Sequence, residues 1–441
     1  MSRPDAPSAS APPPAASPAA SSPRPWTWIP TLYFGQGIPY VVVMTLSVVM
    51  YKNLGLSNTD IALYTSWLYL PWVIKPLWSP VVDLFGRKRG WVVALQALIG
   101  GSLALVALTV PAPFFFRATL AIFWLMAFSS ATHDIAADGF YLLALPKDKQ
   151  AAFVGVRSTF YRLSMIAGSG GLVYLAGHLE TTLGDASRAW SIVFVVLAVA
   201  FGVLAAYHAW MLPRPVADAP TARTGRAWRD GAAIFAAFFK KPGIGGALAF
   251  LLLYRFGEAQ LVKLITPFML DAPAEGGLGL TTEQVGIYYG TFGVVALTIG
   301  GILGGWLIAR FGFRRLLWPM VLAMNLPNLV YVALAYTQPA AGAIVAGALS
   351  IEQFGYGVGF AAYLVYMMRL AEGPHRTAHY AICTGFMALG MMLPGMASGW
   401  LQTRLGYTHF FIWVCAATIP AFIAAAVVHR RLPADEPSSS A

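Results

Sequence analysis

Apolar stretches of about 20 residues, separated by short polar breaks, recur from Trp26 almost to the end of the chain. Such a stretch, coiled into a helix, spans the ~30 Å hydrocarbon core of a bilayer. Of the 441 residues, 58% are hydrophobic and only 11% are charged, against roughly 25% charged residues in soluble domains. These figures exclude an ordinary soluble enzyme and predict an all-α polytopic membrane protein. We predict twelve transmembrane helices, near residues 27–50, 59–82, 91–110, 118–142, 152–177, 189–212, 243–270, 283–309, 316–336, 341–368, 379–403 and 410–428.

The Lys and Arg residues lie mainly on one side of these predicted helices. If the N-terminus is cytoplasmic, the cytoplasmic side carries 20 of them, and the opposite side carries four, at Lys52, Arg117, Arg188 and Arg404. Because basic residues accumulate in cytoplasmic loops, we predict that both termini are cytoplasmic. The net charge of +11 then reflects membrane topology, and no nucleic-acid partner is expected.

The predicted helices divide into two similar halves. Leu56-Ser57-Asn58-Thr59 opens the second helix as Leu280-Thr281-Thr282 opens the eighth, and Gly86 corresponds to Gly312. Many secondary transporters are built from such repeats, with the solute path between the halves. The predicted regions are a disordered tail rich in Ala, Pro and Ser (1–25), a six-helix half (26–212), a cytoplasmic linker (213–242), a second six-helix half (243–430) and a C-terminal tail (431–441).

A loop motif follows the second predicted helix. The residues Asp83-Leu84-Phe85-Gly86-Arg87-Lys88 match the Asp-x-x-Gly-Arg-Arg/Lys core of the corresponding loop in major facilitator superfamily transporters, which the chain resembles. The resemblance implies a conformational gate formed by Asp83, Gly86, Arg87 and Lys88. The alternative is simple positive-inside anchoring, which explains Lys88 and Arg89 but not the spacing of Asp83, Gly86 and Arg87.

Three further segments are similar to one family of these transporters. FGQGIPY (34–40), YLPWVIKPLWSP (69–80) and ATHDIAADGFY (131–141) resemble the AmpG-type muropeptide permeases, whose family includes acetyl-coenzyme A transporters. In the third segment His133 stands where the family commonly has Gln, while Asp134 and Asp138 are kept. The resemblance implies import of muropeptides across the bacterial inner membrane, driven by the proton gradient.

Nine ionisable residues fall inside the predicted spans, where lipid would penalise them. Asp134 and Asp138 are four residues apart and therefore share one helix face. We predict that these two aspartates and His133 couple transport to protons, although a static ion pair, and a buried His that only makes hydrogen bonds, are the alternatives. The nine residues are Lys75, Asp134, Asp138, Arg157, Arg162, Arg255, Glu258, Lys263 and Glu352.

Polar side chains on several predicted helices are candidates for solute binding. Aromatic rings stack on sugar faces, and amides and charged groups bond their rims; the alternatives are helix packing and an intrahelical Arg255–Glu258 pair. The excess of basic over acidic residues favours an anionic or zwitterionic solute. The candidates are Gln36, Tyr40, Lys75, Arg157, Arg162, Arg255, Glu258, Lys263, Glu352, Gln353 and Tyr356. Glycines such as Gly290 and Gly399 are predicted to allow close helix packing.

The leading prediction is a monomeric, proton-coupled importer in the lipid bilayer, with no cofactor and no metal site. Other oligosaccharides, siderophores or acyl-coenzyme A are alternative solutes. An intramembrane enzyme using the aspartate pair, and a sensor that does not transport, are alternatives of other classes. A primary pump is not expected because no Gly-x-x-x-x-Gly-Lys-Ser/Thr loop occurs.

Overall fold

The computed structural model describes residues 24–216, 218–219 and 227–432. The helices before the linker are α1 (Ile29–Val41), α2 (Ser47–Asn53), α3 (Asn58–Trp67), α4 (Leu70–Leu84), α5 (Lys88–Thr109), α6 (Phe115–Ala144), α7 (Lys147–Ile166), α8 (Val173–Leu183) and α9 (Ala186–Met211). Those that follow are α10 (Ala227–Phe239), α11 (Ile244–Leu253), α12 (Phe256–Leu270), α13 (Thr282–Val285), α14 (Val294–Phe311), α15 (Phe313–Asn325), α16 (Leu329–Thr337), α17 (Gly342–Leu370), α18 (Arg376–Ala416) and α19 (Ile419–Arg431). Short 3-10 segments are η1 (Pro25–Thr27), η4 (Pro273–Glu275) and η6 (Leu326–Asn328), and π-helical segments are η2 (Val42–Leu46), η3 (Ala167–Leu172) and η5 (Gly286–Gly293).

The chain is a multi-pass membrane protein. Among the described residues, seven helices are long and apolar enough to cross a bilayer, and a bent pair, Ala232–Phe239 with Ile244–Leu270, would make eight. Every predicted stretch lies on helices, but some are interrupted, as between α3 and α4 at Leu68 and Tyr69. The number twelve therefore stays a prediction.

Two helix boundaries differ from the sequence expectation. The predicted linker 213–242 contains a helix, α10, and the predicted helices at 379–403 and 410–428 are joined by α18. Within α18, Gly406 adopts φ 71° and ψ 167°, which breaks the helical course there. Glycine tolerates this left-handed φ because it has no Cβ.

The repeated openings of the two halves act as helix N-caps. The Ser57 hydroxyl accepts a hydrogen bond from the Asp60 amide (3.1 Å) at the start of α3. Thr281 does the same for the Gln284 amide (3.2 Å) at the start of α13, with Gln284 bonding back to complete a capping box. The similarity of these two sequences thus reflects the need to satisfy free amides at a helix start.

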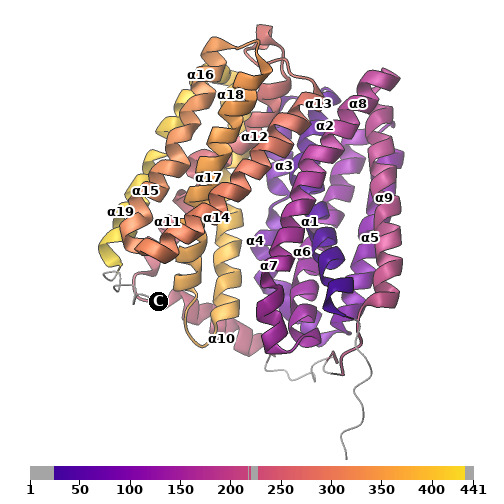
Figure 1. The fold of residues 1–441 in the computed structure, drawn as a ribbon, viewed down its shortest axis with the longest axis vertical. Helices are drawn as coiled ribbons and strands as arrows, with labels where there is room; N and C mark the ends of the chain where they lie inside the picture. Colours follow the sequence, from indigo (N-terminus) through magenta and orange to yellow (C-terminus); the bar gives the residue numbers. More distant parts are fainter. Residues whose placement is uncertain (1–23, 217, 220–226, 433–441) are drawn as a thin grey trace, which may run out of the picture.

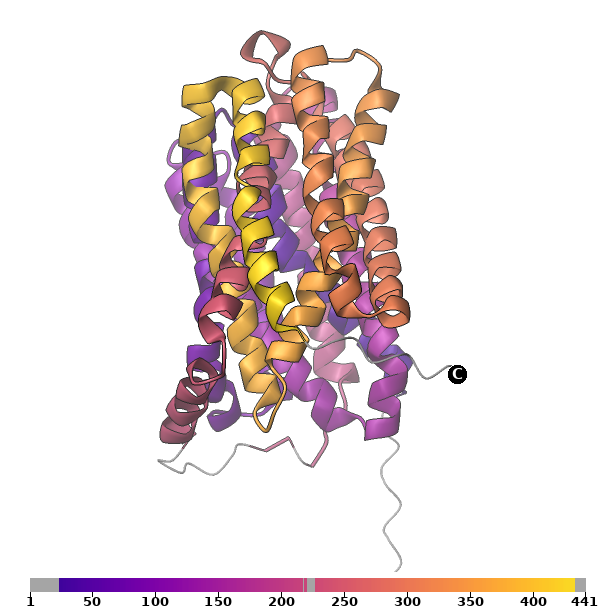
Figure 2. The ribbon, with the colours of Figure 1, turned by 90° about the vertical axis from the view of Figure 1, so that its left-hand side faces the viewer.

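The helices form two groups side by side (Figure 1). Helices α1 to α9 lie in one group, and α11, α12 and α14 to α19 lie in the other; the short α13 packs beside α8 at the upper end, and α10 lies at the lower end. Figure 2, turned by 90°, shows the helices of the second group running along the long axis. Because α10 belongs to the predicted cytoplasmic linker, we refer to the opposite end of the bundle as the distal end.

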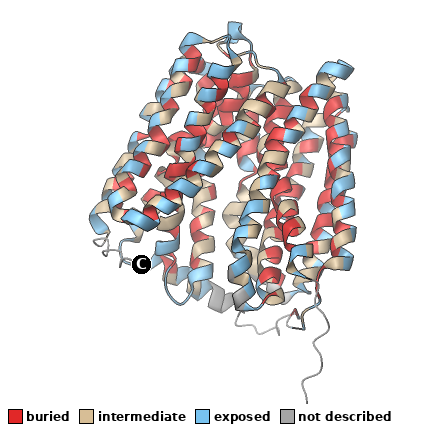
Figure 3. Cartoon of the chain, in the orientation of Figure 1, coloured by how far each residue is buried: buried red, intermediate tan, exposed pale blue. Residues whose placement is uncertain are grey.

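Buried residues concentrate between the helices, and exposed ones lie on the outside (Figure 3). The outside carries large apolar side chains that water would not favour, including Leu108, Val199, Val203, Trp210 and Ile302. An apolar exterior of this kind is suited to lipid rather than to water.

Two seams, both lined by glycine, join the helix groups. Helix α18 packs against α3 and α4, and η3 packs against η5. A Cβ at Gly399 would lie 2.1 Å from the carbonyl oxygen of Asn58, and one at Gly290 would lie 1.9 Å from that of Ser169. The predicted role of these glycines in close backbone approach agrees with this geometry.

We expect Gly399→Ala to lower the thermal stability of the protein. The added methyl group would force α3 and α18 apart, and such overpacking costs about 1–3 kcal/mol. Gly347→Ala is the matched control, because no heavy atom lies within 4 Å of its Cβ position on α17. Thermal unfolding in detergent measures both variants, and equal midpoints would contradict the proposed contact.

Candidate functional site

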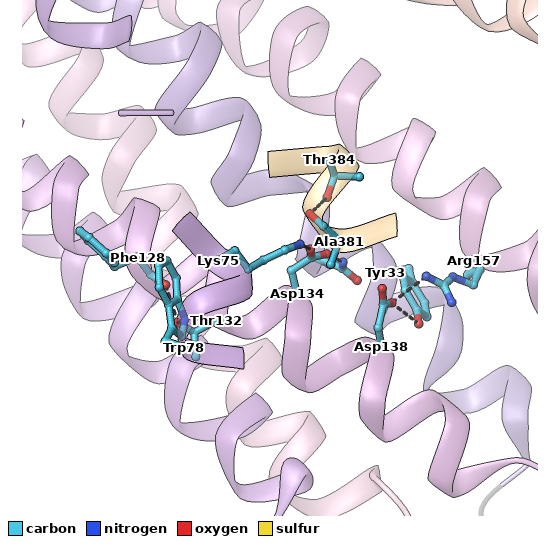
Figure 4. Close-up of polar contacts among 11 residues, drawn as sticks. Tyr33, Lys75, Trp78, Phe128, Thr132, Asp134, Asp138, Arg157, Ala381 and Thr384 are labelled. Carbon is cyan, nitrogen blue, oxygen red and sulfur yellow. Dashed lines mark hydrogen bonds and ion pairs between the residues drawn. The ribbon is translucent and has the colours of Figure 1, made fainter. Parts of the chain in front are cut away.

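A first cluster of charged residues lies within the first helix group (Figure 4). Asp134 on α6 accepts hydrogen bonds from the ammonium group of Lys75 on α4 and the amide of Gln36 on α1. One turn further along α6, Asp138 accepts from Arg157 on α7 (2.6 Å) and from the hydroxyl of Tyr33 on α1 (3.1 Å). Each aspartate therefore has its own cation, which offsets the repulsion expected between two carboxylates on one face.

The two pairs differ in their exposure to solvent. The side chain of Asp138 is 45% exposed and that of its partner Arg157 is 29% exposed. In the other pair, Asp134 is 28% exposed and Lys75 is 17% exposed. The guanidinium of Arg157 also lies over the ring of Tyr33, 4.4 Å from its centre. Asp138 is thus the more accessible of the two carboxyl groups.

His133 lies outside this cluster. Its ring is buried and hydrogen-bonds to Gln96 (3.1 Å), which bonds in turn to His208 (2.8 Å), and His208 contacts Thr31 (3.0 Å). This series of hydrogen bonds links α6, α5, α9 and α1. This placement fits a hydrogen-bonding role in helix packing, because the partner of the His133 ring is Gln96 on α5.

Arg162 is also separate from the aspartates. Its guanidinium contacts the hydroxyl of Thr298 on α14 (3.4 Å), across the boundary between the helix groups. Of Arg157 and Arg162, both on α7, only Arg157 pairs with an aspartate among the described residues. Because Arg157 and Arg162 are five positions apart, their side chains point about 140° from each other around α7, and only one of them can face α6.

A second cluster lies within the other helix group. It consists of Arg255 and Glu258 at α12, Glu352, Gln353 and Tyr356 on α17, and two tyrosines that were not predicted, Tyr289 and Tyr331. Arg255 donates to the hydroxyl of Tyr356 and lies 5.0 Å from the ring centre of Phe360. The predicted alternative of an intrahelical Arg255–Glu258 pair is not formed, because Arg255 lies at the break between α11 and α12 with φ −112° and ψ 20°.

Two further candidate residues contact the segment around the start of α4. Lys263 on α12 donates to the hydroxyl of Thr65 on α3 (3.0 Å), and its ammonium lies 5.1 Å from the ring centre of Tyr69. Tyr40 on α1 packs edge-on against Trp72, with ring centres 5.4 Å apart. Both side chains therefore contact aromatic residues near the start of α4.

The loop of the predicted gate connects α4 to α5. Gly86 has φ 79°, and Arg87 is exposed at the N-terminus of α5. The backbone amides of Lys88 and Arg89 donate to the carboxylate of Asp218 in the linker (2.7 and 3.0 Å). The side chain of Asp83 lies outside the described part, so its predicted role stays a prediction.

A third group of polar contacts joins the two helix groups at the distal end, and we call it the distal contact cluster. Asp271 forms an ion pair with Lys52 and accepts from Asn58 (3.1 Å) and the hydroxyl of Tyr407 (2.6 Å). Nearby, Thr282 bonds to Glu180 (2.7 Å). These contacts hold the ends of α2, α8 and α12 together.

Sequence reasoning missed several of these residues. Tyr33 precedes Gln36 by three positions and so shares its face, a signal that could have identified it. No local pattern pairs Asp271 with Lys52, because they are more than 200 positions apart.

Buried charged clusters in two groups of apolar helices are features of a membrane transporter rather than of a structural membrane anchor. The chain belongs to the Major Facilitator Superfamily, whose sequence model matches residues 31–373. This agrees with the loop motif and with the helical, two-group arrangement.

Among curated proteins, the chain is similar to AmpG-type transporters. It is 26% identical over 414 residues to the anhydromuropeptide permease of Escherichia coli strain K12, covering 91% of this chain and 79% of the permease. It is 25% identical over 402 residues to a putative transporter, AmpG 4, of Rickettsia conorii, covering 88% of this chain and 92% of that protein.

Solved structures show the same fold. A mutant of the nucleoside transporter NupG aligns with a TM-score of 0.70 at 15% identity, covering 91% of this chain and 98% of that one. A D-xylose–proton symporter aligns with a TM-score of 0.69 at 13% identity, covering 92% and 96%.

Proposed function

We propose that this protein is a proton-coupled importer of muropeptides or related amino-sugar solutes in the bacterial inner membrane. The observation that carries the proposal is the similarity to the anhydromuropeptide permease over 91% of the chain. The charged clusters on α1, α4, α6 and α7 and on α12 and α17 provide the groups that such a solute and protons require.

A solute that combines sugar rings with peptide carboxylates fits the chemistry of these residues. Lys75, Arg157, Arg255 and Lys263 supply positive charge, and Gln36 and Gln353 supply amides. The rings of Tyr40 and Tyr356 suit the apolar faces of sugars. Arg162, bonded to Thr298 at the boundary of the helix groups, is a further candidate for an anionic solute group.

Asp138 is the stronger of the two aspartates as a proton carrier. It is the more exposed, and its protonation would cancel the charge that holds Arg157. The released guanidinium could then bind an anionic group of the solute, which links the proton to the solute.

Alternating access would be produced by movement of two halves, 26–212 and 243–430, joined by the linker 213–242. The distal contact cluster would keep one end closed, and the loop containing Gly86, Arg87 and Lys88 would act at the other end. We propose that both termini are cytoplasmic and that the protein works as a monomer.

The geometry favours a transporter over an enzyme using the aspartate pair. An acid–base dyad needs two carboxyl groups with different protonation that act on one substrate. Asp134 and Asp138 instead bind separate cations on α4 and α7.

Uptake into proteoliposomes tests the proposal. With an inward pH gradient of one unit, one coupled proton supplies about 1.4 kcal/mol, enough for about tenfold accumulation of a labelled anhydromuropeptide. Unlabelled muropeptide should compete, whereas neutral oligosaccharides, siderophores and acyl-coenzyme A should not. Recovery of a chemically altered solute would favour the enzyme, and accumulation of another solute class would overturn the proposed substrate.

A further inference from the structure

Two carboxyl groups of the second cluster are buried without a cation. Glu258 on α12 is 1% exposed, and Glu352 on α17 is 0% exposed. Within the described part of the chain, the structure gives neither of them an ion pair. They differ in this from Asp134 and Asp138, each of which faces its own cation.

The hydrogen bonds of these carboxyl groups are also incomplete. One oxygen of Glu352 accepts from the hydroxyl of Tyr331 (2.8 Å) and the amide of Gln353 (3.0 Å). Its other oxygen, and both oxygens of Glu258, have no hydrogen-bond partner among the described residues. An ionised carboxylate in this state is strongly disfavoured, because it is buried and no cation among the described residues pairs with it.

The nearest cations are directed elsewhere. Arg255 donates to Tyr356 and lies against Phe360, while Lys263 donates to Thr65. The two glutamates act on each other electrostatically, so a negative charge on one opposes a charge on the other. The other titratable groups that interact with the pair are Arg255, Tyr289, Tyr331 and Tyr356.

We propose that Glu258 and Glu352 form a second protonation site, which binds a proton in the arrangement seen here and releases it in another stage of the transport cycle. The proton is taken from water on the outer side of the membrane, converts a carboxylate to a neutral carboxyl group, and returns to water on the cytoplasmic side. The released state would be stabilised by Arg255, which precedes Glu258 by three positions and would have to leave the hydroxyl of Tyr356. The role in coupling rests on the proposed proton-driven transport, whereas the presence of the bound proton does not.

The bound proton is tested by infrared spectroscopy of the purified full-length protein. A protonated carboxyl group has a C=O band separate from that of a carboxylate. We expect such a band in the wild-type protein and its weakening in Glu258→Gln and Glu352→Gln, with loss in the double variant. Glu283→Gln, which changes a glutamate paired with the exposed His178, is the matched control and should leave the band unchanged. A wild-type band that neither substitution alters, or no band, would overturn the proposal.

The role in coupling is tested with two transport assays on the same proteoliposomes. Each Gln variant mimics the neutral carboxyl group but cannot release a proton, so exchange of labelled for unlabelled solute should fall less than accumulation does. Under the pH gradient, the ratio of inside to outside solute concentration should fall from about ten to about one. Accumulation equal to wild type would exclude coupling, and loss of both exchange and accumulation would indicate a binding or structural role instead. If the wild-type protein itself accumulates no muropeptide, the proposed function fails, and the infrared result still decides the protonation site.

Discussion

Asp138→Asn is expected to abolish accumulation of solute under a pH gradient. Asn cannot carry a proton, and Arg157 loses the charge that it pairs with. With a gradient of one unit, the concentration ratio should fall from about tenfold to about one. Uptake of labelled solute into proteoliposomes measures this ratio.

Two variants keep this result interpretable. Asp138→Glu retains an ionisable group near Arg157 and should recover part of the accumulation. Asp185→Asn removes the carboxylate of an exposed pair with Arg188 at the start of α9, and it should behave as wild type. Unchanged accumulation in Asp138→Asn would remove this aspartate from the coupling mechanism.

Asp271→Ala is expected to open the distal end of the bundle. The substitution leaves Lys52 without its ion-pair partner and removes an acceptor from Asn58 and Tyr407. Breaking a buried pair costs about 3–5 kcal/mol, and if about 2.7 kcal/mol of this falls on the closed form, the ratio of closed to open forms changes about 100-fold.

A cysteine at Ala62 reports this opening. Ala62 is buried on α3, one turn after Asn58, and therefore faces the seam with α18. In protein with Cys383 and Cys415 replaced by Ala, a hydrophilic maleimide should label Ala62→Cys at least ten times faster when Asp271→Ala is also present. Glu283→Gln is the control at the same end and should change the rate less than twofold, because its partner His178 is exposed. Equal labelling rates would show that Asp271 does not keep this end closed.

Spacing along single helices was sufficient to predict parts of the candidate site. Asp134 and Asp138 share a face of α6 because four residues make about one turn, and an ion pair, which was named as an alternative for them, forms between Asp138 and Arg157. The close approach at Gly290 and Gly399 also followed from small residues at regular spacing.

The alternative of an intrahelical Arg255–Glu258 pair assumed an unbroken helix. Arg255 instead stands at the break before α12 and donates to Tyr356. The linker 213–242 was predicted without a helix, whereas α10 lies within it.

The sequence by itself determined the membrane class, the family and the helices that carry buried charges. These follow from composition and from motifs within short segments, which do not depend on how helices pack. Only the tertiary structure decided which acids pair with cations: Asp134 and Asp138 do, whereas Glu258 and Glu352 form no ion pair within the described part of the chain. Whether a buried acid pairs with a cation depends on the rotation of each helix about its axis and on neighbours distant in the chain. Neither can be predicted from a local sequence pattern.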